Sequence, residues 1–230
     1  SSLKNNNIIA IDGVVVNPML VADFTLAPGQ RIDLLINTVD LLKVDFFEIS
    51  HTKQLKAFTL KVTKADNKTK NITNINFKSN LILPKLDNAK TINIRMQGGA
   101  MGNLSKANLD GVQKDFRTLA TEDKKLWAFN RDIGSYEYLL ATVKLNQVVI
   151  LDVWNDTRWP HSMHLHGNHF FVKSKEFKDN SDYISRDTYL MQAGEKEKLI
   201  FLADNPGKWL FHCHMLEHAA SGMVSYIAVV

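Results

Sequence analysis

This chain has only one cysteine, no long apolar run and a small net charge. One cysteine among 230 residues excludes an internal disulfide. No segment reaches the roughly 20 mostly apolar residues that a membrane-spanning helix needs, so we expect no membrane span. The formal net charge is only +4 and comes from scattered lysines. A solvated surface therefore explains the charge better than a nucleic-acid site does.

The single cysteine lies within a dense group of metal-binding residue types. His212, Cys213 and His214 are consecutive, and His218 and Met223 follow shortly after. A thiolate, imidazoles and a weak thioether suit a copper ion that cycles between its cuprous and cupric states. Zinc also accepts cysteine and histidine, but a structural zinc site does not need this many histidines together with a methionine. The run therefore predicts a copper redox site.

A second histidine run lies upstream, at His161, His164 and His166. The two runs hold six of the eight histidines in the chain. Side chains alternate between the two faces of a strand, so His164 and His166 share a face and His161 turns to the other.

The same alternation sets Cys213 apart from the histidines on either side of it. One strand can then contribute ligands to two metal sites. The simplest division gives one copper Cys213, His161, His218 and Met223, and gives a second centre His164, His166, His212 and His214.

The two runs together resemble the C-terminal copper-binding signature of the multicopper oxidases, a family that includes laccases, copper-efflux oxidases and ferroxidases. The matching patterns are His-X-X-His-X-His at 161–166 and His-Cys-His-X3-His-X4-Met at 212–223. Carried over by position, the resemblance implies a type 1 copper on His161, Cys213 and His218 with Met223 axial, a type 2 copper on His164, and a type 3 pair on His166, His212 and His214.

The resemblance also implies an activity. In this family an electron from a reducing substrate enters at the type 1 copper and crosses the cysteine, here Cys213, to the flanking His212 and His214. Dioxygen is then reduced to water at a trinuclear copper cluster. The expected cofactor is copper, and the expected partners are dioxygen and a small reductant, either a phenol or a metal ion. The sequence leaves the reductant open.

Only half of the histidines of such a trinuclear cluster are found at matching positions. In the family the other half come from two His-X-His motifs of an N-terminal cupredoxin domain, whereas only His51 precedes His161 here. We therefore expect the C-terminal part of a longer oxidase, inactive by itself. Two alternatives stay open: a small blue-copper electron carrier, which has no use for the extra histidines, and a non-catalytic copper-binding module.

Short strands separated by turns predict an all-β chain with a Greek-key sandwich, and the resemblance makes it cupredoxin-like. We expect a complete copper-binding domain at 91–230, a connector at 65–90, and the C-terminal part of a middle cupredoxin-like domain at 1–64. The predicted strands cover residues 8–16 with a break at 12–13, 31–37, 57–62, 91–96, 126–130, 147–154, 170–173, 196–203, 208–213 and 223–230. A short helix is predicted within 113–121.

Several other residues receive weaker interpretations. Met96 and Met101 could capture cuprous ions, although packing or loop roles are favoured. Glu217 and Asp187 could deliver protons, although solvated or structural roles are favoured. His169 is interpreted as structural or supporting. Four glycosylation sequons, relevant only in a eukaryotic secretory pathway, begin at Asn67, Asn71, Asn103 and Asn155.

The family works mainly outside the cytoplasm, so the resemblance implies a periplasmic or secreted protein. A single cysteine kept for metal also avoids stray disulfides in an oxidising compartment. Ser1 is followed by neither a charged nor an apolar signal segment, as expected if the chain is an internal fragment.

Overall fold

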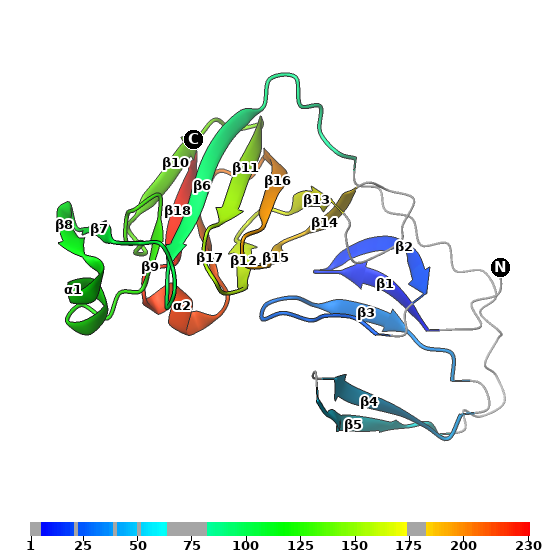
Figure 1. Cartoon of the computed structure of the whole chain (residues 1–230). Helices are drawn as coiled ribbons and strands as arrows, with labels where there is room; N and C mark the ends of the chain where they lie inside the picture. Colours follow the sequence, from blue (N-terminus) through cyan, green and yellow to red (C-terminus); the bar gives the residue numbers. More distant parts are fainter. Residues whose placement is uncertain (1–5, 21–22, 39–40, 50–51, 64–81, 174–182) are drawn as a thin grey trace.

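The computed structural model describes residues 6–20, 23–38, 41–49, 52–63, 82–173 and 183–230. Strands dominate these residues, so the predicted all-β class is confirmed (Figure 1). The predicted connector at 65–90 lies mostly outside the described residues, as does His51. Neither helix in the described ranges is long and apolar enough to cross a membrane.

The larger part of the structure is a sandwich of two sheets. One sheet has the order β10-β18-β17-β12-β15 and the other β14-β13-β16-β11-β6-β9. These strands are β6 (Lys90–Gly98), β9 (Trp127–Phe129), β10 (Leu139–Val143), β11 (Gln147–Asn155), β12 (His161–Leu165), β13 (Phe170–Lys173), β14 (Tyr183–Arg186), β15 (Thr188–Met191), β16 (Lys196–Ala203), β17 (Gly207–Cys213) and β18 (Val224–Val229).

The core lies between these two sheets. Every second residue of β11 is buried, including Val149, Leu151 and Val153. They pack in one cluster with Phe211 and Cys213 from the opposite sheet. This period of two is the pattern of a strand with one face in the core.

The N-terminal part adds a three-stranded sheet of order β2-β1-β3, formed by β1 (Asn7–Ile11), β2 (Val14–Leu20) and β3 (Ile32–Leu35). Asp12 and Gly13 connect β1 to β2, with φ values of 50° and 81°. Both angles suit an Asp-Gly hairpin turn. Ile8 and Ile11 of this sheet pack against Ile184 of β14, so the sheet shares a small core with the sandwich (Figure 1).

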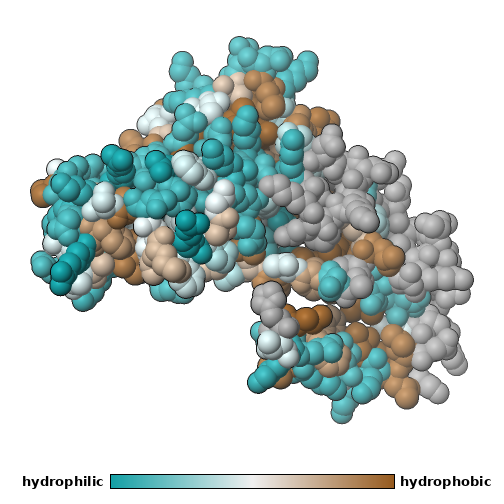
Figure 2. Space-filling view, in the orientation of Figure 1, coloured by the Kyte–Doolittle hydropathy of each residue, from teal (hydrophilic) through white to brown (hydrophobic). Residues whose placement is uncertain are grey.

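A further hairpin, β4 (Lys43–Ile49) with β5 (Gln54–Lys61), stands apart from both cores. All eight residues of β5 are exposed, including Leu55, Phe58 and Leu60. Figure 2 shows hydrophobic residues at the surface in this N-terminal region, at the lower right.

The short helix predicted at 113–121 is present, but it begins three residues later than expected. Residues 112–115 form β8 (Val112–Asp115), which pairs with β7 (Lys106–Leu109), and the helix α1 (Phe116–Thr121) begins only afterwards. Asp115 caps the helix because its side chain accepts a hydrogen bond from the N–H of Thr118 at 3.1 Å. The turn residues Asp110 and Gly111, with φ of 51° and 80°, favour the hairpin and delay the helix.

Candidate metal centre

Two paired strands of one sheet carry most of the predicted ligands. β12 and β17 run antiparallel, with Met163 opposite Cys213 and His164 opposite His212. Residues directly opposite each other share a face of the sheet. Met163 and Cys213 face the core of the sandwich, so His164 and His212 lie on the other face.

The core face holds the first cluster, made of His161, Cys213 and His218. The Cys213 Sγ lies 3.8 Å from His161 Nδ1 and 3.7 Å from His218 Nδ1, and the two Nδ1 atoms are 3.1 Å apart. Three ligands placed 2.0–2.3 Å from one ion in a trigonal plane would be about 3.5–3.8 Å apart. The two distances to Cys213 match this spacing, and the shorter 3.1 Å between the Nδ1 atoms corresponds to a smaller angle between the two imidazoles at the ion. The cluster can therefore hold a single metal ion of the kind that His2Cys sites bind.

A buried network sets the orientation of His161. Its Nε2 lies 2.9 Å from Thr157 Oγ1. The single hydroxyl proton of Thr157 is directed to an acceptor, Asn155 Oδ1 at 2.7 Å or the Trp159 carbonyl at 3.0 Å. The hydroxyl therefore accepts the proton of His161 Nε2, which leaves Nδ1 with a free lone pair pointing at Cys213. This is how supporting hydrogen bonds orient metal-binding histidines.

A short helix between β17 and β18 supplies His218. This helix, α2 (Leu216–Ala220), was not expected from the sequence. The backbone of Met223 connects two residues of the first cluster, since Cys213 N–H donates to the Met223 carbonyl at 3.0 Å and Met223 N–H donates to the His218 carbonyl at 2.9 Å. Met223 is fully buried in the same core cluster as Cys213.

Trp127 covers this cluster and was missed by the sequence reasoning. Its ring centroid is 4.7 Å from those of both His161 and His218, and the residue is buried. A Cβ atom at Gly99 would lie 2.3 Å from the Trp127 ring. The Gly98-Gly99 pair was the available signal, because glycine marks a close approach of the backbone.

The opposite face holds the second cluster, made of His164, His166 and His212, whose ligand atoms lie within 4.8 Å of one another. The Nε2 atoms of His166 and His212 are 2.9 Å apart. His214 lies beside this cluster, with its ring centroid 5.6 Å from that of His164 and 5.8 Å from that of His212. His166 is exposed, so the second cluster lies at the surface of the described part of the chain.

Backbone carbonyls select the tautomers in the second cluster. His164 Nδ1 lies 3.0 Å from the Asp187 carbonyl, and His212 Nδ1 lies 2.9 Å from the Cys213 carbonyl. A carbonyl only accepts hydrogen bonds, so each Nδ1 carries the proton. In both rings Nε2 is left as the ligand atom.

Burial favours the neutral form of four imidazoles in the two clusters. Desolvation lowers the pKa of His161 to about 3 and that of His212 to about 4, and it also lowers the pKa of His166 and His218. Burial raises the pKa of the Cys213 thiol to about 11. Histidine lone pairs are thus available at neutral pH, whereas a metal ion must displace the proton of Cys213.

The metal-free chain is expected to lose stability in acid. The histidine pKa values lie below the ordinary 6.5 in the folded state, so the unfolded state takes up protons first. The contribution is complete above about pH 6.5, falls as the pH drops below that value, and is lost once the pH has passed about 4 for His212 and about 3 for His161. Each histidine adds a slope of up to about 1.4 kcal/mol per pH unit. Urea unfolding measured from pH 8 to pH 4 tests this, and His161→Phe should flatten the slope.

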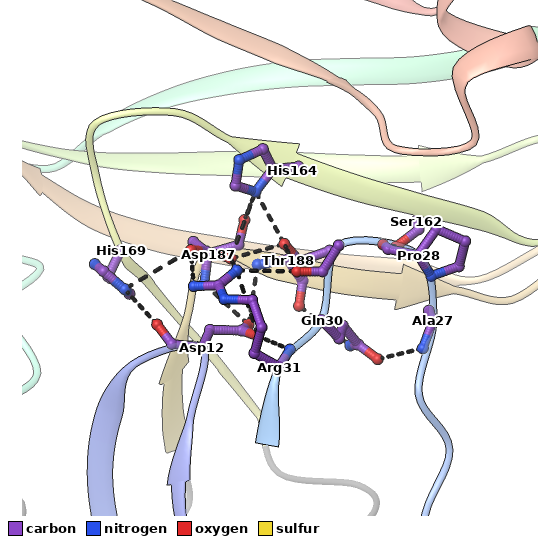
Figure 3. A network of polar contacts seen from close by, with 11 residues as sticks. Asp12, Ala27, Pro28, Gln30, Arg31, Ser162, His164, His169, Asp187 and Thr188 are labelled. Carbon is purple, nitrogen blue, oxygen red and sulfur yellow. Dashed lines mark hydrogen bonds and ion pairs between the residues drawn. The ribbon is translucent and has the colours of Figure 1, made fainter. Parts of the chain in front are cut away.

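Residues of the N-terminal part contact the strands that carry both clusters (Figure 3). Ser162 Oγ donates to the Pro28 carbonyl at 2.7 Å. Gly29 lies so close to His214 that a Cβ would be 2.6 Å from the ring. Arg31 forms an ion pair with Asp187 at 2.7 Å. Residues 28–31, within the predicted middle-domain part at 1–64, therefore border the second cluster.

Three weaker candidates lie outside both clusters. His169 Nε2 donates to the Asp12 carbonyl at 3.1 Å, which is a structural contact. Burial raises the pKa of Asp187, but hydrogen bonds from His164, Arg31 and Thr188 outweigh burial and hold it below its usual value. Glu217 is exposed on α2. The lowered pKa of Asp187 does not suit a proton donor at neutral pH.

The structure argues against two lesser ideas. Met96 is fully buried in the core, whereas Met101 is 76% exposed, so they do not form a joint capture site for cuprous ions. Asn155 is fully buried, and its amide donates to three carbonyls. Attachment of a glycan there would break the network that orients His161. Asn67 and Asn71 lie outside the described residues.

Comparison with known proteins gives one family throughout. The sequence profile described as multicopper oxidase matches residues 106–230, slightly more than half of the chain. The chain is 35% identical over 97 residues to the iron multicopper oxidase fer1 of Mycosarcoma maydis, covering 36% of this chain and 15% of fer1. It is 28% identical over 156 residues to the multicopper oxidase mco of Staphylococcus haemolyticus, covering 63% of this chain and 33% of mco.

Solved structures agree on the fold. The McoA multicopper oxidase of Aquifex aeolicus superposes with a TM-score of 0.72 at 22% identity, covering 97% of this chain and 49% of McoA. The expected cupredoxin-like fold is confirmed by this likeness. The chain thus spans about half of such structures and at most a third of the two curated relatives named above.

Proposed function

This chain belongs to the multicopper oxidase family, and we propose that it is the C-terminal, copper-binding part of an enzyme that couples one-electron oxidation of a small reductant to reduction of dioxygen to water. Bound copper would supply the one-electron redox chemistry. One observation carries the proposal: Cys213 belongs to the first cluster, and its chain neighbour His212 belongs to the second. A path of a few covalent bonds therefore joins two groups of ligands.

In this proposal each cluster has its own task. His161, Cys213 and His218 would hold a type 1 copper, and the fully buried Met223 would be its weak fourth ligand. Thr157 keeps His161 in the tautomer that binds metal, and Trp127 excludes water from both imidazoles. The close packing around these side chains fixes their positions. A fixed set of ligands suits a copper ion that changes its charge while its ligands stay in place.

The second cluster forms one side of a trinuclear copper site. We assign His164 to the type 2 copper and His166, His212 and His214 to the type 3 pair. The ligand atoms of His164, His166 and His212 lie within 4.8 Å of one another, and the His166 side chain is exposed. A surface location leaves room for further histidines from an N-terminal cupredoxin domain, and the limited share of the relatives that this chain spans supports such a domain.

We further propose that the chain consists of the C-terminal part of a middle cupredoxin-like domain at 1–64, a connector at 65–90 and the copper-binding domain at 91–230. The exposed apolar side chains of the β4–β5 hairpin, such as Leu55 and Phe58, are in keeping with more chain packing there. We propose that the reductant is a phenol or a metal ion, and the name of the iron multicopper oxidase fer1 is in keeping with the metal ion. We propose a periplasmic or secreted location.

Copper titration of the metal-free chain tests the first site. Addition of copper should give an intense blue absorption that saturates at one equivalent, because only a copper–thiolate bond gives that charge transfer. Further equivalents should bind more weakly and add little colour. Copper binding without blue colour at any stoichiometry would refute the type 1 assignment and favour a non-catalytic copper-binding module.

A further inference from the structure

We propose that Asp12 and Arg31 of the N-terminal part are positioning residues for His164, acting through Asp187 and Thr188. The inference extends the proposed function, because it assigns to the N-terminal part a role in preparing a ligand of the second cluster. Figure 3 shows Asp187 and Thr188 between His164 on one side and Asp12 and Arg31 on the other.

His164 is held by two acceptors at the start of β15. Its Nδ1 lies 3.0 Å from the Asp187 carbonyl and 2.9 Å from Thr188 Oγ1. The Thr188 hydroxyl proton is directed to Asp187 Oδ1, at 2.7 Å. The hydroxyl can therefore only accept from His164. Both contacts favour the Nδ1–H tautomer and direct Nε2 toward His166 and His212.

Residues 187 and 188 are in turn held from the N-terminal part. Arg31 donates to both carboxylate oxygens of Asp187, at 3.0 Å and 2.7 Å. Such bidentate pairs fix the angle of a carboxylate as well as its distance. Loss of Arg31 would free Asp187 to rotate and would release the partner of the Thr188 hydroxyl.

Asp12 holds residues 187 and 188 through their backbone N–H groups. Its side chain is fully buried. Its Oδ2 accepts from the N–H groups of Asp187 and Thr188 at 3.3 Å and 3.2 Å, and its Oδ1 accepts from the N–H of Arg31 at 2.9 Å. One carboxylate thus joins the β1–β2 turn, the start of β3 and the residues that bind His164.

The alternative is that this network only clamps two parts of the chain together. A clamp would change the melting temperature and nothing else, whereas a positioning network would also change the tautomer and the metal affinity of His164. Loss of hydrogen bonds that support a metal ligand typically weakens metal binding by about 10–100-fold. These readouts separate the two roles.

The test uses the metal-free 230-residue chain, labelled with 15N, in mildly alkaline buffer. Long-range 1H–15N spectra report which nitrogen of His164 carries the proton, with the assignment made from His164→Gln. Wild type should show the Nδ1–H form. Arg31→Met and Asp12→Asn should show a mixture of tautomers, and Arg31→Lys, which keeps the charge without the bidentate contact, should lie between. Thr188→Val tests the same link without altering the N-terminal part.

Divalent copper is the second probe. Arg31→Met, Asp12→Asn and Thr188→Val should each weaken the copper equivalents beyond the first by about tenfold or more, with the blue band unchanged. Lys114→Met is the control, since it removes the Lys114–Asp123 ion pair of 2.8 Å on the β8–α1 segment, which holds no residue of either cluster.

Each result has a definite meaning. A wild-type tautomer and wild-type affinity in all three variants, with only a lower melting temperature, would overturn the inference. Equal weakening of both sites would also overturn it, because it indicates general destabilisation. Neither readout needs turnover or colour from the second cluster, so a failure of the proposed oxidase function would be seen separately.

Discussion

Cys213→Ser is expected to remove the blue absorption of the copper-loaded chain completely. A serine hydroxyl is a hard ligand and cannot give the thiolate-to-copper charge transfer. Cys213 is fully buried among apolar side chains, so the hydroxyl should also lower the stability of the metal-free chain by about 1–3 kcal/mol. Visible spectra of the variant at equal copper content, with urea unfolding of the metal-free form, give both values.

Of two buried methionines, Met163 provides the control and Met223 provides a second test of the site. Met163 lies opposite Cys213 on β12 and is fully buried, so Met163→Leu should keep the colour and cost less than about 1.5 kcal/mol. Met223→Leu should keep the colour but raise the reduction potential, since a weak electron-rich axial ligand is lost. Blue colour that persists in Cys213→Ser would disprove the thiolate assignment, and an unchanged potential in Met223→Leu would remove Met223 from the site.

The second large effect concerns dioxygen. The copper-loaded chain alone is not expected to reduce dioxygen by four electrons, because in the proposed function the second cluster would supply only one side of a trinuclear site. Metal sites that lack half of their ligands bind weakly and in open geometries. Expression with an N-terminal cupredoxin domain that carries two His-X-His motifs should create the activity, measured as dioxygen consumption with a phenol or a ferrous salt.

In that complete enzyme, His212→Ala or His214→Ala should lower dioxygen reduction by at least about 100-fold while most of the blue absorption remains. Losses of supporting residues alone cost about 10–100-fold, and a lost ligand should cost more. His212 lies on the face of the sheet opposite Cys213, which is why the colour should survive.

Lys114→Met again serves as the control, since Lys114 pairs with Asp123 and lies in neither cluster. Stopped-flow reoxidation of the reduced enzyme distinguishes loss of dioxygen chemistry from loss of electron entry. Oxidase-like consumption by the isolated chain, or histidine variants that lose colour yet keep turnover, would contradict the division of ligands between two faces.

Much of the fold was predictable because it depends on local pattern. Alternating apolar residues marked β11 and β16, and Asp12-Gly13 marked the turn between β1 and β2. The short helix predicted at 113–121 is present but begins only at Phe116, because the hairpin turn at Asp110-Gly111 extends strand β8 to Asp115. The short helix α2, with only five residues, was missed because so short a helix has little pattern of its own.

The sequence by itself determined the ligand types, their spacing and their division between two faces, because alternation along a strand is a local property of the backbone. Only the tertiary structure decided which ring nitrogen of His161 and of His164 carries the proton and which is left to bind a metal ion. Thr157 orients His161, and Asp187 with Thr188 orients His164. Arg31 and Asp12 reach Asp187 from more than 150 positions away. No local pattern encodes such contacts, because they exist only once separate sheets have packed against each other.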